Sequence, residues 1–401
     1  MNNLVFLTMS RIDDISRRGI YTDLLRKFRD EGWNVYILTP HERSLGKPTE
    51  IDAKNGVHIL GVKTFNLQKT STIEKGIGQV LVEGQYKRAI NKYLPSVRFD
   101  LILYSTPPIT FSRVIAFLKK QNPKAISYLL LKDIFPQNAV DLGMMSKSGL
   151  NGMIYRFFRR KEKMLYALSD YIGCMSPANV EYVVKHNPEV ALARVEIAPN
   201  SIELRPIGTI DREAIRLKYG LPTNRPVFIY GGNLGKPQGI PFLIDCLDAN
   251  GNRMDCHFVV LGDGTEQKGL MSWYDNNKPK SVTVLERLSK EDYDMLAASC
   301  DVGLIFLDHR FTFPNYPSRL LPYLENRMPV IVATDPHCDM GKIAEENGYG
   351  FWCESNSVDA FTVALEKMLH TDRSMMGERG YEFLCKNYLV QYTYNAIVKH
   401  V

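Results

Sequence analysis

The segment VFIYGGNLGKPQGIPFLI, residues 227–244, indicates how the chain folds. An apolar run of strand length ends in paired glycines, and a helical pattern follows Gly239. A strand, a tight turn and a helix form the repeating unit of a parallel sheet covered by helices. The glycines allow a close turn, and Lys236 supplies a mobile cation at the mouth of the helix. This equipment suits a diphosphate, and an ordinary glycine-rich turn is the alternative.

The same unit recurs on both sides of this segment. Before it, strand-like runs such as NLVFLTM, NVYILTP, DLILYST and AISYLLL alternate with amphipathic stretches, and the alternation restarts after a linker-like piece at 204–226. The sequence therefore predicts an α/β protein with two Rossmann-like lobes facing across a cleft. We expect residues 1–203 to form the first lobe and 204–380 the second. A helix within 381–401 is expected to pack back on the first lobe.

Composition narrows the class of protein. Hydrophobic residues make up 45% of the 401 and charged residues 23%, which is ordinary for a globular chain without a membrane span. Seven cysteines occur singly, which favours reduced thiols in the cytoplasm and argues against a zinc site. The start reads as a first strand rather than a signal peptide. A net charge of +6 suits a phosphate-bearing substrate or an anionic membrane surface, and is too small to indicate nucleic-acid binding.

Two loops of the first lobe contain candidate site residues. Lys132 and Asp133 follow the apolar run YLLL, at the end of a strand where ligands bind in open α/β sheets. Asp133 could orient or deprotonate an acceptor hydroxyl, or it could cap the next helix. Gly19, preceded by Arg18, opens a helix after the first strand and could bring backbone N–H groups and a cation to a substrate. A basic surface loop is the alternative there.

The ordered set of motifs resembles the retaining nucleotide-sugar glycosyltransferases with the GT-B fold, family four, over nearly the whole chain. The match is nearest to a subgroup from capsule and O-antigen pathways. Its motifs correspond here to Asp133-Ile134-Phe135-Pro136, to the turn Gly232–Gly239, to Gly262-Asp263-Gly264, and to Pro317-Ser318-Arg319 before Pro329-Val330-Ile331.

The resemblance implies a nucleotide-sugar donor that is bound mainly by the second lobe. The subgroup implies that this donor is a UDP-sugar. The implied donor-binding residues are Gly232, Asn233, Gly235, Lys236, Gln238, Ser318 and Arg319. Glu286, after the strand-like run SVTVLE, is a further donor-binding candidate, although a solvated glutamate is the favoured interpretation. The resemblance also implies an acceptor in the first lobe, where we expect Asp133 and Lys132 to be catalytic and Arg18 and Gly19 to lie on the acceptor side. Such sites stabilise the leaving diphosphate with helix N-termini and cations, so neither a metal nor another cofactor is expected.

The chain departs from the family pattern at its donor grip. The family usually has two glutamates in this region, and counting back from Pro329 places Pro322 and Pro314 at their positions. Pro322 is tolerated only in a first helical turn, so that helix should begin no earlier than about Ser318. Glu325 is a possible substitute for the missing clamp, although a solvated helix glutamate is the favoured interpretation.

The stretch 152–168 places Met153, Phe157, Met164 and Leu168 along one helix with arginines and lysines between them. Such a helix could lie on an anionic bilayer, or it could pack on the core with a solvated basic face.

Together these features predict a retaining glycosyltransferase acting in cell-envelope polysaccharide synthesis. It would move a sugar, N-acetylated or deoxy, from a UDP-sugar to a lipid-linked or oligosaccharide acceptor, in the cytoplasm or on the inner face of the membrane. A non-catalytic GT-B scaffold is one alternative, motivated by the missing glutamates. A nucleotide-sugar epimerase is another.

Overall fold

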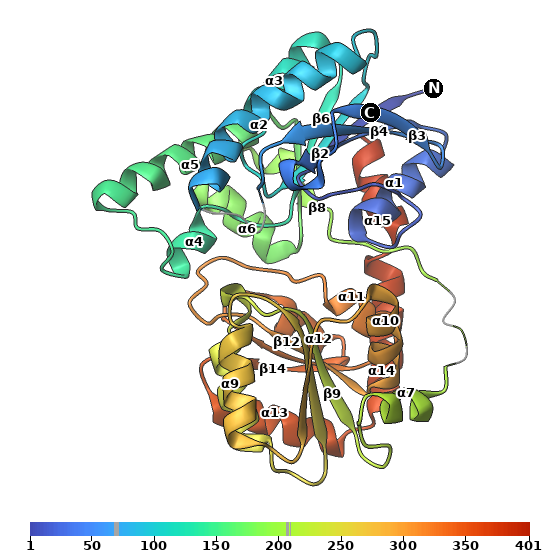
Figure 1. The fold of residues 1–401 in the computed structure, drawn as a ribbon, viewed down its shortest axis with the longest axis vertical. Coiled ribbons are helices and arrows are strands. Elements are labelled where there is room, and N and C mark those ends of the chain that lie inside the picture. Colours follow the sequence, from blue (N-terminus) through green and yellow to red (C-terminus); the bar gives the residue numbers. More distant parts are fainter. Residues whose placement is uncertain (68–71, 206–207, 209) are drawn as a thin grey trace. The chain divides into compact units, whose positions relative to one another are not determined.

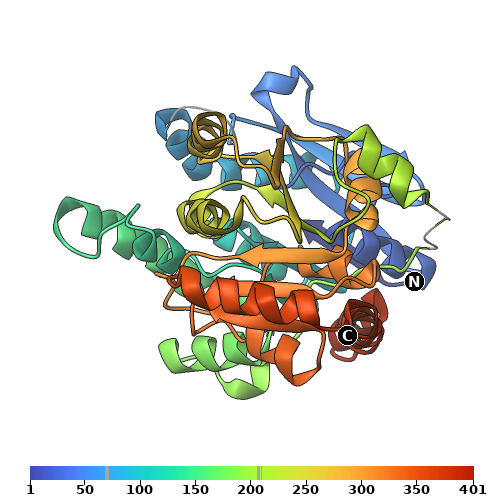
Figure 2. The same cartoon turned by 90° about the horizontal axis from the view of Figure 1, so that it is seen from below.

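The computed structural model describes residues 1–67, 72–205, 208 and 210–401, which divide into two compact units (Figure 1). The first unit comprises Met1–Glu203 and Leu389–Val401, and the second comprises Leu204–Tyr388. Each unit is built around its own largely parallel sheet with helices packed against it, as Figure 2 shows from a second direction. The predicted α/β class and the two Rossmann-like lobes are therefore confirmed.

The first unit has an eight-stranded sheet in the order β3-β4-β2-β1-β5-β6-β7-β8. Neighbouring strands pair in parallel, except that β3 runs antiparallel to β4 at one edge. The strands are β1 (Asn3–Leu7), β2 (Asn34–Glu42), β3 (Glu50–Lys54), β4 (Val57–Thr64), β5 (Leu101–Thr106), β6 (Ile126–Leu131), β7 (Tyr171–Cys174) and β8 (Val195–Ile197).

The helices of the first unit follow its strands and cover the sheet. They are α1 (Ile20–Asp30), α2 (Thr72–Tyr93), α3 (Ser112–Gln121), α4 (Gln137–Asp141), α5 (Gly149–Leu168), α6 (Pro177–His186) and α15 (Val390–Val398), with the short 3-10 turns η1 (Arg43–Leu45) and η2 (Leu192–Arg194). Among the described residues, no helix is long and apolar enough to cross a membrane.

The C-terminal segment completes the core of the first unit. Tyr394 of α15 lies with its ring centroid 4.9 Å from that of Phe28 on α1, and Trp33 donates from Nε1 to the Tyr394 hydroxyl at 3.3 Å. Within 381–401, residues 381–388 belong to the second unit and residues 389–401 to the first. The crossover between the units therefore comes after α14 (Arg373–Asn387).

The second unit has a six-stranded sheet, all of whose strand pairs are parallel, in the order β11-β10-β9-β12-β13-β14. Its strands are β9 (Val227–Asn233), β10 (His257–Asp263), β11 (Val282–Leu285), β12 (Val302–Phe306), β13 (Val330–Thr334) and β14 (Gly350–Glu354). Its helices are α7 (Arg212–Lys218), α8 (Ile240–Asn250), α9 (Gln267–Asn277), α10 (Lys290–Ser299), α11 (Leu320–Glu325), α12 (Met340–Glu346), α13 (Val358–His370) and α14, with the 3-10 turn η3 (Lys236–Gln238).

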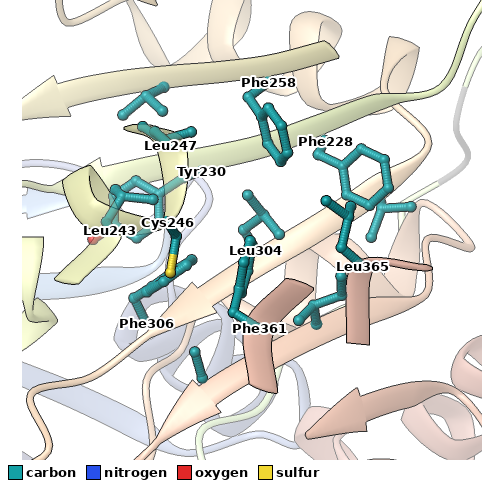
Figure 3. Close-up of a cluster of buried hydrophobic side chains, with 14 of the residues drawn as sticks. Phe228, Tyr230, Leu243, Cys246, Leu247, Phe258, Leu304, Phe306, Phe361 and Leu365 are labelled. Atoms are coloured by element: carbon teal, nitrogen blue, oxygen red, sulfur yellow. The ribbon is translucent and has the colours of Figure 1, made fainter. Parts of the chain in front are cut away.

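The core of the second unit explains why its strands read as continuous apolar runs. Alternate strand residues such as Phe228 and Phe258 pack towards Leu243 of α8 and Phe361 of α13 (Figure 3). The intervening residues are also buried, because helices cover both faces of a parallel sheet. This rigid layer fixes the strand ends from which the candidate site residues project.

Both sheets reverse their strand order beside their first strand, between β1 and β5 in one unit and between β9 and β12 in the other. In open parallel sheets, ligands bind at such a switch point, beyond the carboxyl ends of the strands. The loops after β1 and β9 are therefore the first places to look for a site.

Candidate functional site

The turn after β9 contains five of the predicted donor-binding residues in one compact structure. Gly232 has φ 125°, which side chains disfavour, and Gly235 leads into η3. Asn233 donates from Nδ2 to Oε1 of Gln238 at 2.8 Å and so closes the turn across its mouth. The side chain of Lys236 is exposed, and no carboxylate pairs with it within the described part of the chain. The turn thus presents backbone and one free cation beyond the end of β9.

Backbone packing holds this turn on the neighbouring strand ends. Leu234 donates its N–H to the carbonyl of Asp263 at 2.9 Å, and Asp308 donates to the carbonyl of Pro237 at 3.0 Å. A Cβ at Gly262, which has φ 147°, would collide with the carbonyl oxygen of Gly232. The turn therefore rests on β10 on one side and on the residues after β12 on the other, at the switch point.

Arg319 lies beside the same turn. Its guanidinium carbon sits 4.3 Å from the centroid of the Tyr230 ring, and a Cβ at Gly232 would lie 3.7 Å from Nη2. Nη1 is buried and has no hydrogen-bond partner among the described residues. Because a guanidinium stays charged in proteins, Nη1 is a buried charged donor that makes no hydrogen bond within the described part of the chain.

Two further tyrosines shape the surroundings of Arg319. Tyr323 of α11 donates its hydroxyl to the carbonyl of Ile229 at 3.2 Å and lies against Gly303, and Tyr293 of α10 lies against Gly231. A Cβ at either glycine would collide with the ring it faces. Burial raises the pKa of the Tyr293 hydroxyl to about 12, so this tyrosine stays neutral.

The helix α11 explains how the chain accommodates Pro322. It begins at Leu320, so Pro322 lies in its first turn and the predicted limit for its start is confirmed. Ser318 is exposed just before it. The prediction that Glu325 is solvated is wrong. This residue is 2% exposed, and its Oε1 accepts a hydrogen bond from the N–H of Arg205 at 3.4 Å.

Glu286 stands apart from these residues. It is exposed in the loop after β11, which is separated from β9 by β10, and its neighbour Arg287 pairs with Asp263 at 3.0 Å. A nearby Asp-x-Asp triplet at 292–294 lies on α10. Its two carboxylates pair with lysines, Asp292 with Lys218 and Asp294 with Lys290.

In the first unit, Lys132 and Asp133 follow β6, where Thr106 of β5 fixes the backbone. The Thr106 hydroxyl donates to the carbonyl of Asp133 at 3.1 Å and accepts from the N–H of Lys132 at 3.1 Å. Oδ2 of Asp133 accepts from Nδ2 of Asn138 at 2.8 Å, while Nζ of Lys132 donates to the carbonyl of Ala198 at 3.0 Å. The two side chains therefore have separate partners.

The titration of this pair is shifted towards neutrality. Burial raises the pKa of the Asp133 carboxyl to about 6, and burial lowers the pKa of the Lys132 ammonium to about 7. A carboxylate with a pKa near the working pH is suited to accept a proton from a hydroxyl group.

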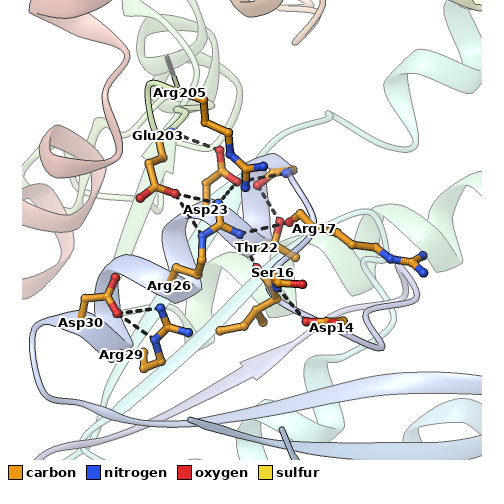
Figure 4. A network of polar contacts seen from close by, with 12 residues as sticks. Asp14, Ser16, Arg17, Thr22, Asp23, Arg26, Arg29, Asp30, Glu203 and Arg205 are labelled. Atoms are coloured by element: carbon orange, nitrogen blue, oxygen red, sulfur yellow. Dashed lines mark hydrogen bonds and ion pairs between the residues drawn. The ribbon is translucent and has the colours of Figure 1, made fainter. Parts of the chain in front are cut away.

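The loop after β1 contains Arg18 and Gly19, and a buried ion network holds it (Figure 4). Arg26 of α1 donates to the carbonyls of Ile15 and Arg17 and pairs with Asp23 and Glu203. Gly19 donates its N–H to Oδ1 of Asp23 at 3.1 Å and leads into α1. The same network therefore positions the loop and the start of the helix.

The structure thus brings Gly232, Asn233, Gly235, Lys236 and Gln238 together with Arg319, and Ser318 is its chain neighbour. Tyr230 and Tyr293 were not anticipated. Tyr230 stood directly before the glycines in the sequence, whereas nothing local in the sequence pointed to Tyr293.

A comparison with family models bears on what this arrangement belongs to. Residues 211–383 match the family described as "Glycosyl transferases group 1". This range holds the glycine turn, α11 and the whole six-stranded sheet. The second lobe is therefore similar to a group 1 glycosyltransferase domain.

Two curated bacterial proteins are similar to this chain. "Probable glycosyltransferase WbjE" of Pseudomonas aeruginosa is 23% identical over 73% of this chain and 71% of its own length. "Putative colanic acid biosynthesis glycosyl transferase WcaI" of Escherichia coli K12 is 21% identical over 61% of this chain and 60% of its own length.

Solved structures confirm the GT-B fold. Sucrose-phosphate synthase from Thermosynechococcus elongatus matches with a TM-score of 0.76 at 14% identity, covering 100% of this chain and 98% of the other. Anabaena HepE in complex with UDP and glucose matches with a TM-score of 0.68 at 14% identity, covering 100% and 99%.

Proposed function

We propose that this chain is a group 1 glycosyltransferase. It transfers a sugar from a UDP-sugar to a lipid-linked or oligosaccharide acceptor, with retention of configuration, in the synthesis of a cell-envelope polysaccharide. The observation that carries the proposal is Nη1 of Arg319 beside the glycine turn, which is buried and has no hydrogen-bond partner among the residues that the structure describes. A buried charged donor is costly unless a ligand satisfies it, and a diphosphate supplies the oxygens it lacks.

The donor diphosphate in this proposal lies beyond the end of β9. Arg319 contributes one face of the site, its planar guanidinium already oriented by the Tyr230 ring. Lys236 and the backbone of residues 232–235 contribute the other. Charge that develops on the leaving diphosphate is then stabilised by groups already in place, which is the largest single contribution in many transferases. No metal is needed for this arrangement.

The choice of nucleotide and of pathway draws on proteins to which the chain is similar. HepE is described in complex with UDP and glucose, and WcaI is named for colanic acid biosynthesis. By analogy we assign a UDP-sugar and an envelope polysaccharide, with the acceptor in the first lobe near Arg18 and Gly19. An N-acetylated or deoxy sugar follows from the subgroup that the motifs resemble.

Asp133 is proposed as the group that receives the acceptor's proton. As the bond between the sugar and the diphosphate breaks and a bond to the acceptor oxygen forms, the hydroxyl proton passes to the Asp133 carboxylate. Its pKa of about 6 leaves it ionised at neutral pH but still basic enough to accept that proton. Lys132, bonded to the carbonyl of Ala198, is proposed to position the same loop.

The rival function is a GT-B protein that binds no donor, and one observation favours it. Prolines stand at positions 314 and 322, where the family usually has glutamates, and the nearby Glu325 is buried against the backbone of Arg205. Under this hypothesis the chain lacks the glutamates that would bind the ribose of the donor, and it serves as a partner of other enzymes.

A thermal-shift panel separates the two functions. UDP, GDP, ADP and CMP are added to the full chain, first without metal and then with Mg²⁺. The transferase proposal predicts that UDP raises the melting temperature most and that Mg²⁺ adds nothing. The scaffold reading predicts no shift with any of the four nucleotides.

We also propose that α5 brings the enzyme to the inner face of the membrane. Met153 and Phe157 are 61% and 49% exposed on this helix, and Arg156 and Arg160 are exposed beside them without a carboxylate partner in the described ranges. An apolar strip flanked by arginines fits an anionic lipid surface. Lys161 faces the other way, since it is buried and pairs with Glu83 at 2.9 Å.

A further inference from the structure

A cavity of about 590 Å³ lies in the first unit, at the carboxyl end of β4. It is lined by three separate parts of the chain: the connection from β2 to β3, the end of β4 with the residue after it, and the C-terminal half of α2. The lining residues are Arg43, Thr49, Lys63, Thr64, Phe65, Gln85, Arg88, Ala89, Lys92 and Tyr93. The end of β4 lies four strand positions from β6, or about 19 Å from the strand that leads to Asp133.

Hydrogen bonds between these parts give the cavity a defined shape. Tyr93 donates its hydroxyl to the carbonyl of Thr49 at 2.6 Å, which ties α2 to the β2–β3 connection. Lys63 donates its N–H to Oγ1 of the same threonine at 2.9 Å, which ties β4 to it as well. The walls are therefore set by tertiary structure and need no ligand to form.

The cavity carries an uncompensated positive charge. Arg43, Lys63, Arg88 and Lys92 all have exposed side chains and line it, and no carboxylate is among the described lining residues. Within the described part of the chain none of the four forms an ion pair, whereas Lys119 in the same unit pairs with Asp170 at 2.6 Å. Four cations around one opening favour an anion.

Two of the lining residues, Thr64 and Gln85, each have a polar atom that is buried and unsatisfied. Oγ1 of Thr64, a residue that is 2% exposed, and Oε1 of Gln85 have no hydrogen-bond partner among the described residues. Buried polar atoms nearly always have partners, so two such atoms on residues that line one cavity point to a ligand that supplies hydroxyl or similar groups. Phe65 and Tyr93 add aromatic surface against which a sugar ring can lie.

We propose that this pocket binds a phosphate-bearing saccharide. Arg43, Lys63, Arg88 and Lys92 take the phosphate, and Thr64 and Gln85 take sugar hydroxyls. A volume of about 590 Å³ is within the usual range for a site that encloses a small ligand. The further step, that this saccharide is part of the acceptor, rests on the proposed transferase function, whereas binding itself does not.

Calorimetric titration of the full chain tests the pocket, with glucose 1-phosphate, inorganic phosphate and glucose as probes. Arg88→Gln with Lys92→Gln removes two of the lining cations on the exposed face of α2. Lys120→Gln with Lys124→Gln removes two exposed lysines of the same unit outside the pocket and serves as the matched control. Arg319→Gln reports any binding at the glycine turn of the second unit.

We expect saturable binding of both phosphate probes and none of glucose. The Arg88/Lys92 pair should weaken that binding about tenfold or more, because hydrogen bonds to charged groups are lost, and the control pair and Arg319→Gln should leave it unchanged. Thr64→Val keeps the side-chain shape. This variant should weaken the binding of glucose 1-phosphate and leave the binding of inorganic phosphate unchanged. It should not lower the melting temperature, because the Thr64 hydroxyl has no hydrogen-bond partner among the described residues.

Three results would overturn the proposal that this pocket binds a phosphate-bearing saccharide. The first is no saturable binding of either phosphate probe. The second is a loss confined to Arg319→Gln, which would place the probes at the glycine turn. The third is an equal loss in the control pair, which would mean an adventitious ion only. A different outcome would separate the two proposals. If the parent chain neither binds UDP nor transfers a sugar, but the Arg88/Lys92 variant still loses binding of the phosphate probes, the transferase function and the acceptor role are rejected. The proposal that the pocket binds a phosphate-bearing saccharide then stands.

Discussion

Arg319 combines a favourable contact with an unfavourable one. Its guanidinium stacks on Tyr230, which is worth about 0.5–2 kcal/mol, but its buried Nη1 lacks a partner, which costs about 1–3 kcal/mol. Such a balance is expected where a side chain is kept for a ligand rather than for stability.

Arg319→Met should therefore leave the free energy of unfolding of the ligand-free protein unchanged or slightly higher. The methionine keeps most of the apolar contact with the tyrosine and removes the unsatisfied donor. Denaturant unfolding of the second unit measures this. A loss above about 2 kcal/mol would mean that the guanidinium has a structural partner and was not left open for a ligand.

The titration of Asp133 gives a pH-dependent prediction. Burial raises the pKa of its carboxyl from 3.8 to about 6 in the folded protein, so the folded state binds the proton more tightly than the unfolded state does. The resulting stabilisation is fully present below pH 3.8 and is lost as the pH rises through 6.

Asp133→Asn removes this titration. At pH 7 the variant should be more stable than the parent, by at most about 3 kcal/mol, and the difference should shrink as the pH falls from 6 towards 4. Denaturant unfolding at pH 7 and pH 4.5 makes the comparison. A difference that does not depend on pH would show that the carboxyl titrates as it does in water.

At the scale of elements, the glycine turn depends on the close approach of β9 and β10. Gly262→Ala should lower the stability of the second unit by about 2 kcal/mol or more, since a Cβ collides with the Gly232 carbonyl at a positive φ. Gly269→Ala in α9 is the matched control. Nothing lies within 4 Å of its Cβ, and it should add up to about 1 kcal/mol. If Gly262→Ala matched its control, the turn would not be fixed by this contact.

The exposed face of α5 makes a second prediction at this scale. The double variant Met153→Ser, Phe157→Ser should lose flotation with vesicles that contain phosphatidylglycerol, because it removes the apolar strip and leaves the arginines. Met254→Ser, which changes another exposed methionine, should float like the parent chain. Equal flotation with pure phosphatidylcholine, or none with either vesicle, would contradict a membrane role for this helix.

At the scale of the whole molecule, the fold was readable from the sequence because its signals are local. Apolar strand runs, glycine turns and amphipathic stretches each occupy a dozen residues, and their alternation specifies two parallel sheets. The start of α11 followed from Pro322 for the same reason, since a proline constrains its own turn.

What was not readable depends on residues far apart in the chain. Glu325 has a solvated pattern within its helix but is 2% exposed, and one of its contacts is the backbone N–H of Arg205, 120 residues earlier in the chain. Tyr293 of α10 contacts Gly231 of β9, which lies 62 residues earlier in the chain. The cavity at the end of β4 is lined by residues between Arg43 and Tyr93 that share no sequence motif. Residues so far apart in the chain can be recognised as neighbours only from the folded structure, because the sheets determine the distances between them.

The two proposals assign a separate binding property to each unit. We assign a nucleotide to the second unit and a saccharide bearing phosphate to the first. Arg319→Gln should abolish the effect of UDP on the melting temperature and keep glucose 1-phosphate binding, and the Arg88/Lys92 pair should do the reverse. Loss of both properties in either variant would mean that one site serves both ligands.

The most direct test of the central claim is a calorimetric titration of UDP into the parent chain, Arg319→Gln and Arg327→Gln. Arg327 is a matched control, because its guanidinium also stacks on a tyrosine of the second unit, at 3.9 Å from Tyr381, but already pairs with Glu378. We predict that Arg319→Gln weakens UDP binding by about 1.5–3 kcal/mol and that Arg327→Gln does not. Unchanged affinity in Arg319→Gln, or no binding by the parent chain, would contradict a donor site at the glycine turn.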